Sequence, residues 1–448
     1  MQAAAPAPRI AFYGDDFTGA TDTLATAAQA GLRSLLFLRV PSAAQLARAG
    51  RLDCLGIAGA ARSMNPDEMA RELAPVADFL RASGARLLHY KVCSTFDSAP
   101  SVGNMDTALR ALLPASGHDW AAIVGGQPSL GRYCLFGNLF AAAGTGGEVH
   151  RIDRHPTMSR HPVTPMHEAD LRRHLAEQGL AAIGHVPWTA LNSGDAALRQ
   201  CMDAALAKRP RALLFDVGEA RDLAAIGRSL IRFADQAPLL VLGSSSVVQA
   251  VAAADAGGDA ASSVASAQAM PDTGIAPASG PVLLIAGSLS PLTARQVEAA
   301  ASFDKLWLDA PRLIESDGVS LRDCARELSA KLASGRHVLA CTSSPGQPAT
   351  AQGVPARALA EATGALLAAV LAQVPLARIG IAGGDTSSHA VQALDAWGLS
   401  HAGSLAPGVA LCRLHSDRPA LDGLEVMLKG GQMGGEDLFE SLVHGTAH

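Results

Sequence analysis

The residues with the clearest chemical potential follow the first apolar run of the chain. Residues 9–13 (RIAFY) lead directly into residues 14–23 (GDDFTGATDT). A buried strand that ends in acidic and hydroxyl residues at a helix start places polar side chains at the carboxyl edge of a sheet, where open α/β folds bind ligands. We therefore expect Asp15 and Asp16 to contact a small-molecule substrate.

Two further apolar runs of the first half end in polar residues. Arg62 and Ser63 follow one run, and Lys91, Ser94 and Thr95 follow the other. A guanidinium group pairs with a carboxylate at two points and an ammonium group adds a point charge, so Arg62 and Lys91 are expected to meet a substrate carboxylate. Taken singly, these residues could cap a surface loop or a helix. Their convergence with the acidic loop on one sheet edge favours a binding site.

A basic loop between residues 154 and 166 contains two Arg-His-Pro steps. Proline restricts its own backbone and that of the preceding residue, which would hold neighbouring side chains in place. The loop could therefore cover a small anion, with Arg160 and His161 as candidate substrate contacts. The alternative is a solvent-exposed connector whose prolines only block helix formation.

The second half carries three loops of small residues after predicted strands. Glycines let backbone amides approach a phosphate closely, and hydroxyl groups at a helix start complete an anion cradle. The candidate nucleotide contacts are Ser288 in the first loop, Gly383, Gly384, Asp385 and Thr386 in the second, and Lys429, Gly430 and Gly431 in the third. Asp385 could also hold Mg²⁺ through water. A helix is expected at residues 390–396, behind the second loop.

Each of these loops alone is weak evidence, because a glycine pair after a strand is commonly a tight turn. The chain has neither the GxxxxGK[ST] pattern of a P-loop nor a GxGxxG pattern after its first strand. The residues support a small-molecule site in the first half and a phosphate or nucleotide site in the second. That arrangement suits phosphoryl transfer.

The length of 448 residues predicts two domains. A stretch rich in Ala, Gly, Ser, Asp and Pro marks a linker at residues 252–281. We therefore expect an N-terminal sugar-acid-binding domain at residues 1–251 and a C-terminal nucleotide-binding domain at residues 282–448, the names of both resting on the resemblance given below.

Composition excludes several classes of protein. The net charge of −5 and the lack of clustered Lys and Arg argue against a nucleic-acid partner. No apolar run reaches the roughly 20 residues of a spanning helix, and residues 1–9 lack the pattern of a signal peptide, so we expect a cytoplasmic protein without a membrane partner. The seven cysteines form no CxxC pair, which argues against a disulfide framework or a structural zinc site.

Apolar runs alternate with helix-like stretches along the whole chain, which predicts parallel sheets. The strands are expected at residues 34–38, 54–58, 87–91, 121–124, 212–216, 239–242, 282–286, 337–341, 378–382 and 425–428, and helices at 105–113, 293–301 and 356–372. The predicted fold class is α/β, with two domains that each contain a largely parallel sheet flanked by helices.

Five ordered motifs of the chain resemble those of the four-carbon acid sugar kinase family. They are GDDFTGA (14–20), YKVCSTFDS (90–98), HPVTPM (161–166), GGDTS (383–387) and KGGQMG (429–434). The second and third look most like the 3-oxo-tetronate kinase branch. The resemblance implies a sugar-binding and a nucleotide-binding domain, with ATP and Mg²⁺ as cofactors and a sugar acid as substrate. A homodimer is the oligomer considered.

Two departures from the family pattern concern the substrate. The family's first loop usually reads Ala-Asp-Asp where this chain has Tyr13-Gly14-Asp15-Asp16, and the late loop usually reads KSGNFG instead of KGGQMG. The expected reaction is phosphorylation of the terminal hydroxyl of a 3-oxo-tetronate to its 4-phosphate. The alternatives are 3-oxo-isoapionate, a branched relative, and D-threonate or D-erythronate.

The resemblance suggests Asp16 as the residue that orients the hydroxyl group or accepts its proton. Two other classes of protein are alternatives to a kinase. An aspartyl-phosphate phosphatase needs Asp-x-Asp, and Phe17 stands where its second Asp should be. A non-catalytic sugar-acid-binding protein would have no use for three phosphate-cradling loops.

Overall fold

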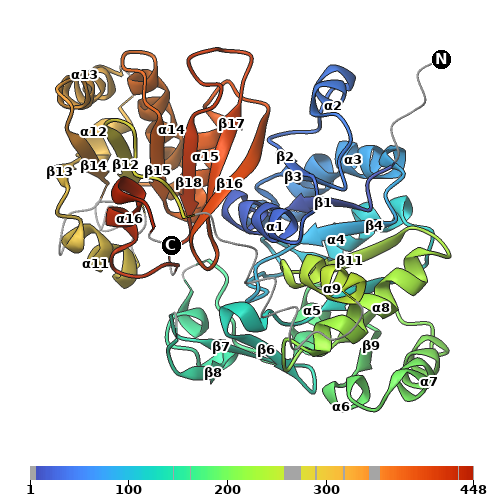
Figure 1. Ribbon diagram of the computed structural model, residues 1–448. Helices are drawn as coiled ribbons and strands as arrows, with labels where there is room; N and C mark the ends of the chain where they lie inside the picture. Colours follow the sequence, from blue (N-terminus) through green and yellow to red (C-terminus); the bar gives the residue numbers. More distant parts are fainter. Residues whose placement is uncertain are drawn as a thin grey trace, which may run out of the picture. The chain divides into compact units, whose positions relative to one another are not determined.

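The computed structural model describes residues 7–144, 146–161, 163–256, 274–287, 290–315, 318–342, 354–431 and 433–446. These residues form two compact units (Figure 1). The first takes its residues from 1–15, 26–35 and 40–270, and the second from 16–25, 36–39 and 271–448. The chain therefore first passes from one unit to the other between Asp15 and Asp16. The domain limits expected at residues 251 and 282 stay a prediction.

The first unit is built on a parallel sheet with the strand order β3-β1-β4-β11-β5-β10-β9. Its strands are rich in apolar residues that are buried on both faces, as a sheet covered by helices on each side requires. They are β1 (Ile10–Gly14), β3 (Cys54–Ala58), β4 (Leu87–Lys91), β5 (Ala121–Val124), β9 (Ile183–Val186), β10 (Ala212–Phe215) and β11 (Leu239–Gly243), and β2 (Ser34–Phe37) precedes β3 in the chain. All of these but β9 were predicted, to within one residue at each end.

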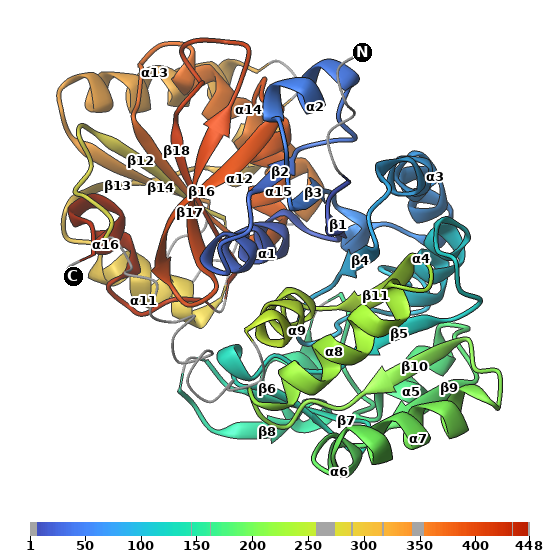
Figure 2. The same cartoon turned by 45° about the vertical axis from the view of Figure 1, so that its right-hand side comes forward.

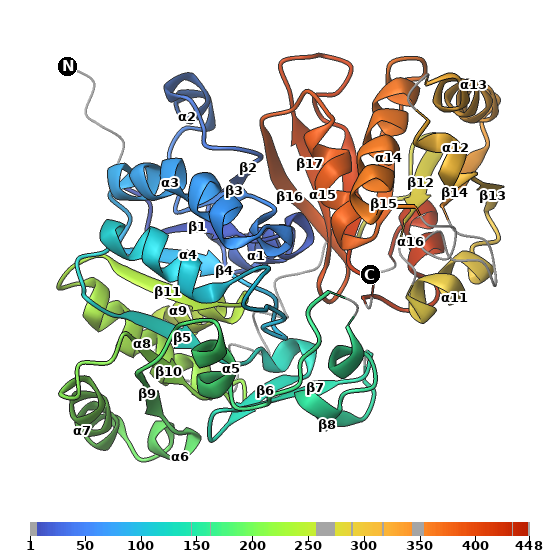
Figure 3. The same cartoon turned by 180° about the vertical axis from the view of Figure 1, so that it is seen from behind.

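Helices cover both faces of this sheet. Helices α8 and α9 lie on one face, and α3 and α4 lie on the other (Figures 1 and 3). The helices of the first half are α1 (Phe17–Gln29), α2 (Ala43–Ala49), α3 (Pro66–Ser83), α4 (Met105–Leu112), α5 (Leu171–Glu177), α6 (Trp188–Leu191), α7 (Asp195–Leu206), α8 (Asp222–Ala234) and α9 (Ser246–Asp255). The start of α3 follows from local sequence: Asn65 and Glu68 form a capping box, and Pro66 occupies the first turn.

A separate antiparallel sheet of three strands belongs to the first unit (Figure 2). It consists of β6 (Arg132–Leu135), β7 (Asn138–Ala142) and β8 (Val149–Arg151). None of these three strands was predicted. They are only partly buried, so they lack the long apolar runs that marked the others.

The second unit has a mixed sheet with the order β13-β14-β12-β15-β18-β17-β16. The neighbours β13-β14-β12-β15-β18 are all parallel. Strand β17 is antiparallel to both β18 and β16. The strands are β12 (Val282–Ala286), β13 (Phe303–Trp307), β14 (His337–Cys341), β15 (Arg378–Ala382), β16 (Gly398–Ala406), β17 (Val409–His415) and β18 (Glu425–Lys429). The expectation of a largely parallel sheet holds, and β16 and β17 are the antiparallel addition.

The helices of the second unit also flank its sheet. Helices α11 and α16 lie on one face and α14 and α15 on the other (Figures 1 and 3). The helices are α11 (Pro291–Ala299), α12 (Ala310–Leu313), α13 (Val319–Ala333), α14 (Ala356–Leu371), α15 (Gly384–Gln392) and α16 (Leu438–His444). The prediction of a helix at residues 390–396 was wrong: α15 begins at Gly384, so most of the supposed loop is its first turns.

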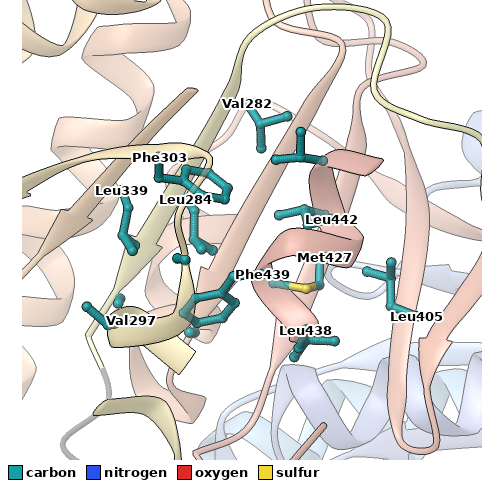
Figure 4. Close-up of a cluster of buried hydrophobic side chains, with 14 of the residues drawn as sticks. Val282, Leu284, Val297, Phe303, Leu339, Leu405, Met427, Leu438, Phe439 and Leu442 are labelled. Carbon is teal, nitrogen blue, oxygen red and sulfur yellow. The ribbon is translucent and has the colours of Figure 1, made fainter. Parts of the chain in front are cut away.

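Alternate residues of the second sheet pack under α11 and α16. Val282 and Leu284 of β12 join Met427 of β18 in a buried cluster with Val297 of α11 and Phe439 of α16 (Figure 4). Since side chains of a strand alternate between faces, this cluster fixes which residues of β12 and β18 face these two helices. The same strands carry the loops that were expected to bind nucleotide.

Among the helices that the structure describes, none combines the length and hydrophobicity needed to cross a bilayer.

Candidate active site

The first polar cluster lies where β1, β3 and β4 end. These parallel strands are in register, with Gly14 paired to Ala58 on one side and to Lys91 on the other. Asp15 therefore leaves the sheet at the same level as the residues that follow β3 and β4. The expected convergence of three strand ends is present in the first unit.

Asp15 and Arg62 form a two-point ion pair in this cluster. The Arg62 Nη2 lies 2.7 Å from Asp15 Oδ1, and Nε lies 3.2 Å from Oδ2. The backbone reinforces the pair, because the Arg62 amide donates to the Asp15 carbonyl oxygen at 3.1 Å. Two of the expected substrate contacts are thus already bound to each other. Ser63 is exposed, and its hydroxyl donates to the carbonyl oxygen of Ala60.

Lys91 is the last residue of β4 and is buried, with 3% of its surface exposed. The Asp15 amide donates to its carbonyl oxygen at 3.0 Å, which ties the two strand ends together. Within the described ranges, its ammonium group has no recorded hydrogen bond or ion pair. An anionic ligand would stabilise a buried ammonium group that has no such partner.

The loop after β4 holds a buried carboxylate that sequence reasoning did not single out. The Thr95 hydroxyl donates to Asp97 Oδ1 at 2.6 Å and lies 2.9 Å from the sulfur of Cys93. Burial raises the pKa of Asp97, but the charge of Arg62, the Thr95 hydrogen bond and the charge of His161 outweigh it, so that the pKa is lowered. Asp97 is therefore a buried anion in this loop.

Hydrogen bonds from the first unit fix the far side of the same loop. Ser98 Oγ donates to the carbonyl oxygen of Phe96 and lies 3.0 Å from His174 Nε2. Gln178 donates to Ser98 Oγ at 2.7 Å, and its own Oε1 accepts from the Met105 amide. Phe96 adopts a positive φ of 53°, which is unusual for a residue with a large side chain. These contacts hold the loop in that conformation.

The basic loop contains histidines with different surroundings. His155 is buried, and its Nδ1 accepts from the amides of Thr157 and Met158, so it stabilises the turn and is not presented to a ligand. His161 is half-buried and its Nδ1 accepts from the Thr164 amide. Arg160 is exposed. Of the two expected contacts in this loop, only His161 has a recorded electrostatic link to the strand-end cluster, through Asp97.

Asp16 caps the start of α1. Its Oδ1 accepts from the Gly19 amide at 3.0 Å, and its Oδ2 accepts from the Thr18 hydroxyl at 2.6 Å. The carboxylate is 8% exposed. The geometry is compatible with both a helix cap and contact with a ligand.

Tyr13 packs against Glu72 of α3, Tyr90 and the first residue of the loop after β3. It is fully buried, stacks on Tyr90 with ring centroids 6.0 Å apart, and donates to Glu72 Oε1 of α3 at 3.2 Å. A Cβ at Gly59 would lie 1.9 Å from its hydroxyl oxygen. The Tyr13 side chain therefore contributes to the packing behind the loop that leads to Arg62.

The second polar cluster lies at the ends of β12, β15 and β18 in the other unit. The register pairs Ala382 with both Ala286 and Lys429. The loop amides cross-link these ends: Gly287 donates to the Ala382 carbonyl oxygen and Gly383 donates to that of Lys429, both at 2.8 Å. The structure thus brings together the three small-residue loops of the second half.

Two glycines here are needed for close approach and for backbone conformation. A Cβ at Gly287 would lie 2.1 Å from Thr386 Oγ1, and Gly383 has a φ of 132°. A Cβ at Gly384 would meet no atom of the described residues within 4 Å, so none of them covers the start of α15. Amides at a helix start that opens in this way can receive a phosphate.

Lys429 is the last residue of β18 and has no exposed surface. Its Nζ donates to Thr293 Oγ1 at 2.7 Å and to the Gly431 carbonyl oxygen at 3.3 Å. Burial lowers the pKa of Lys429 to about 7. Lys429 was expected to contact nucleotide, but its fixed position depends on Thr293, 136 residues away in sequence.

Helix α11 supplies polar contacts that sequence reasoning missed. Ser290 caps the helix at the Thr293 amide, and its hydroxyl also donates to the Gly431 carbonyl oxygen. Gln296 is fully buried and donates to the carbonyl oxygens of Met433 and Gly435 at 3.1 and 2.7 Å. The signal available in the sequence was the three-residue spacing of Ser290, Thr293 and Gln296, which places them along one side of a helix beside a predicted loop.

Two expected nucleotide contacts fall outside what can be described. Ser288 and the side chain of Asp385 do not belong to the described residues. Elsewhere in the described ranges, no group of three His, Cys, Asp or Glu side chains could hold a metal ion. A single carboxylate would fit the way in which Mg²⁺ is often bound beside nucleotide phosphates, through one or two carboxylates and water, so the Asp385 assignment stays a prediction.

Comparison with known proteins assigns a family to these two clusters. A family model described as a sugar-binding N-terminal domain matches residues 10–251, and one described as a nucleotide-binding C-terminal domain matches residues 283–439. The chain is 37% identical to a Paraburkholderia graminis protein named 3-oxo-isoapionate kinase, over 96% of this chain and 93% of that one. The chain belongs to the four-carbon acid sugar kinase family. The family predicted from the five sequence motifs is therefore confirmed.

Other relatives of this family extend the comparison to the fold. A Methylobacterium radiotolerans protein named 3-oxo-tetronate kinase is 31% identical, with 95% of this chain and 96% of that protein covered. Among solved structures, a Salmonella typhimurium LT2 protein matches with a TM-score of 0.74, and the Haemophilus influenzae protein HI1011 with a TM-score of 0.67. Both are 25% identical, with 96% of this chain and 98% of theirs covered. The prediction of an α/β fold with two largely parallel sheets is thus confirmed.

Proposed function

We propose that this sugar-acid kinase transfers the γ-phosphoryl group of ATP to the terminal hydroxyl group of a 3-oxo sugar acid. The observation that carries the proposal is the 37% identity, over 96% of the chain, to a protein named 3-oxo-isoapionate kinase. The two polar clusters support it, because one offers a buried cation to an acid and the other offers glycine-rich loops to a polyphosphate.

The first cluster suggests how the acid is bound. The Lys91 ammonium group would receive the substrate carboxylate, since no anionic partner of it is recorded in the described part of the chain. Arg62 would add a second contact while it stays paired with Asp15. Ser94 and Thr95 are buried beside Lys91 and would orient hydroxyl groups.

Asp16 would orient the attacking hydroxyl group or accept its proton. Its carboxylate is already held by Thr18 and Gly19, so its orientation does not have to be fixed when the substrate binds. Phosphoryl transfer depends mainly on positioning and charge neutralisation, and a positioned base typically contributes about 10²-fold to 10⁴-fold.

The second cluster would bind ATP. The open start of α15 at Gly384 and Thr386, together with the loop of Gly430 and Gly431, would receive the phosphates. Lys429 would lie beside them. Mg²⁺, when bound, would neutralise phosphate charge, with Asp385 as its candidate contact through water.

The identities favour a branched substrate over a linear one. The relative named for 3-oxo-isoapionate shares 37% of its residues with this chain, whereas the relatives named for 3-oxo-tetronate share 27% to 31%. We therefore place 3-oxo-isoapionate first, ahead of the 3-oxo-tetronates that the sequence motifs favoured. D-threonate and D-erythronate remain alternatives.

A coupled assay of ADP release over these four acids tests the proposal. We expect the highest kcat/KM with 3-oxo-isoapionate, and phosphate on the terminal oxygen of the product. A phosphatase would release phosphate without ATP, and a non-catalytic sugar-acid-binding protein would bind an acid without forming ADP. ADP release with none of the acids, in protein that binds ATP, would contradict the proposal.

A further inference from the structure

The buried Lys429 has a neutral environment on every side that the structure describes. Its Nζ contacts the Thr293 hydroxyl group and the Gly431 carbonyl oxygen, and it lies 5.9 Å from the centre of the Phe439 ring. No ion pair of Lys429 is recorded among the described residues. Taking a charged ammonium group out of water is costly unless an anion compensates, so this site favours the neutral amine while no ligand is bound.

Charged groups on the neighbouring elements are engaged elsewhere. Helix α11 carries Arg295, which is exposed and paired with Glu436. Helix α16 carries Glu440, whose carboxylate accepts from Ser302 and pairs with His444. None of these four has a recorded contact with Lys429.

The strands beside Lys429 are similarly uncharged at this edge. Arg378 of β15 and Glu425 of β18 form an ion pair at the ends of these strands that are far from Lys429. Arg413 of β17 is exposed and lies opposite Glu425 in the sheet. Helix α15 contributes His389, which is half-buried, and Asp385, whose side chain lies outside the described residues. His389 is thus the second titratable group to be tested.

We propose that nucleotide binds to this protein together with a proton, which is taken up by Lys429. The inference rests on the proposed function, since it needs a polyphosphate beside the strand end at Lys429. The anion supplies the opposite charge that the site lacks, so the amine becomes an ammonium group in the complex. The proton comes from solvent, and no covalent bond changes.

Proton uptake has a consequence for affinity at alkaline pH. Burial lowers the pKa of Lys429 to about 7 in the ligand-free protein, and a nearby polyphosphate raises it. Above pH 7 each bound nucleotide must therefore recruit a proton. Nucleotide affinity should fall by up to about tenfold per pH unit above 7, until the pH exceeds the pKa in the complex.

Isothermal titration calorimetry of the full chain with the magnesium complex of a non-hydrolysable ATP analogue tests this. At pH 8, titrations in buffers of different ionisation enthalpy should give an uptake of about 0.9 proton per nucleotide, falling to about 0.1 at pH 6, as expected for a group with a pKa near 7. Uptake near zero at pH 8 would overturn the inference and leave the proposed function intact. Absence of nucleotide binding would overturn both.

Variants assign the proton to its residue. Lys429→Arg keeps a permanent charge, so it should bind the analogue without proton uptake, whereas Lys429→Met should bind it at least about tenfold more weakly and also without uptake. His389→Gln should retain the wild-type uptake. Unchanged uptake in Lys429→Met, or its loss in His389→Gln, would show that Lys429 is not the acceptor.

Discussion

Arg62 holds Asp15 through two atoms of its guanidinium group, with Nη2 2.7 Å from Oδ1 and Nε 3.2 Å from Oδ2. The Asp15 side chain is 3% exposed, so the pair stands largely outside solvent. An ammonium group cannot reproduce this fork. Arg62 is thus bound to Asp15 before a substrate arrives.

We predict that Arg62→Lys raises KM for the sugar acid by about tenfold or more, because the fork and its orientation are lost. The free energy of unfolding should fall by about 1 to 2 kcal/mol. Arg33→Lys is a matched control, since Arg33 makes the same two-point pair with Asp53 on the exposed surface. Steady-state kinetics and urea unfolding measure both effects. Equal behaviour of the two variants would contradict the assignment of Arg62 to the site.

Asp16→Asn separates the capping role of Asp16 from its proposed catalytic role. Asparagine can still accept from the Gly19 amide, so the stability of α1 should change by less than about 1 kcal/mol. The loss of the carboxylate should lower kcat by about 10²-fold to 10⁴-fold with little change in nucleotide affinity. Asp16→Ala loses the cap as well and should unfold more easily. Near-native turnover in Asp16→Asn would refute the role.

The apolar strands could be predicted because they are buried on both faces, whereas the missed ones depend on context. Strand β13 alternates between buried and exposed residues, and β16 contains Ser400, His401 and Ser404, so neither has a continuous apolar run. The start of α15 was placed too late because Gly383 and Gly384 are typical of loops. Residues 385–389, which belong to the first turns of α15, were therefore assigned to a loop.

Contacts between distant residues were the part of the candidate sites that could not be predicted. The apolar runs and the polar residues after them identified Arg62, Lys91 and Lys429 as polar residues at strand ends. That Arg62 is paired with Asp15, and Lys429 with Thr293, depends on which strands become neighbours in the sheet. The order of strands in a sheet cannot be read from the order of apolar runs in a single sequence.

We predict that Gly384→Ala weakens nucleotide binding by about tenfold or more without changing the melting temperature. A Cβ at this position would clash with none of the residues that the structure describes, so the fold should tolerate it, but it would enter the space proposed for phosphate. Gly280→Ala is the control, because a Cβ there also meets nothing within 4 Å and Gly280 belongs to no proposed site. Calorimetric titration with ADP and thermal unfolding measure the two properties. Unaltered ADP affinity in Gly384→Ala would contradict the phosphate assignment.

Lys429→Met should stabilise the ligand-free protein at pH 7. The pKa of Lys429 is about 7 in the folded chain and near 10.5 in the unfolded chain. Between these values the unfolded state binds more protons, so the stability of the wild type rises with pH and the variant lacks this increment. The advantage of the variant should therefore shrink by about 2 kcal/mol between pH 7 and pH 9. Urea unfolding at both pH values checks this, and an unchanged difference would contradict it.

The contact between Tyr13 and Gly59 constrains the order in which this part of the chain can change. A Cβ at position 59 would lie 1.9 Å from the Tyr13 hydroxyl oxygen and 2.1 Å from the ring carbon that bears it, so removal of the hydroxyl alone would not make room. Substitution at position 59 becomes sterically possible only after Tyr13 has been replaced by a much smaller residue. The two positions are therefore epistatic: any side chain at position 59 requires a smaller residue at position 13 first.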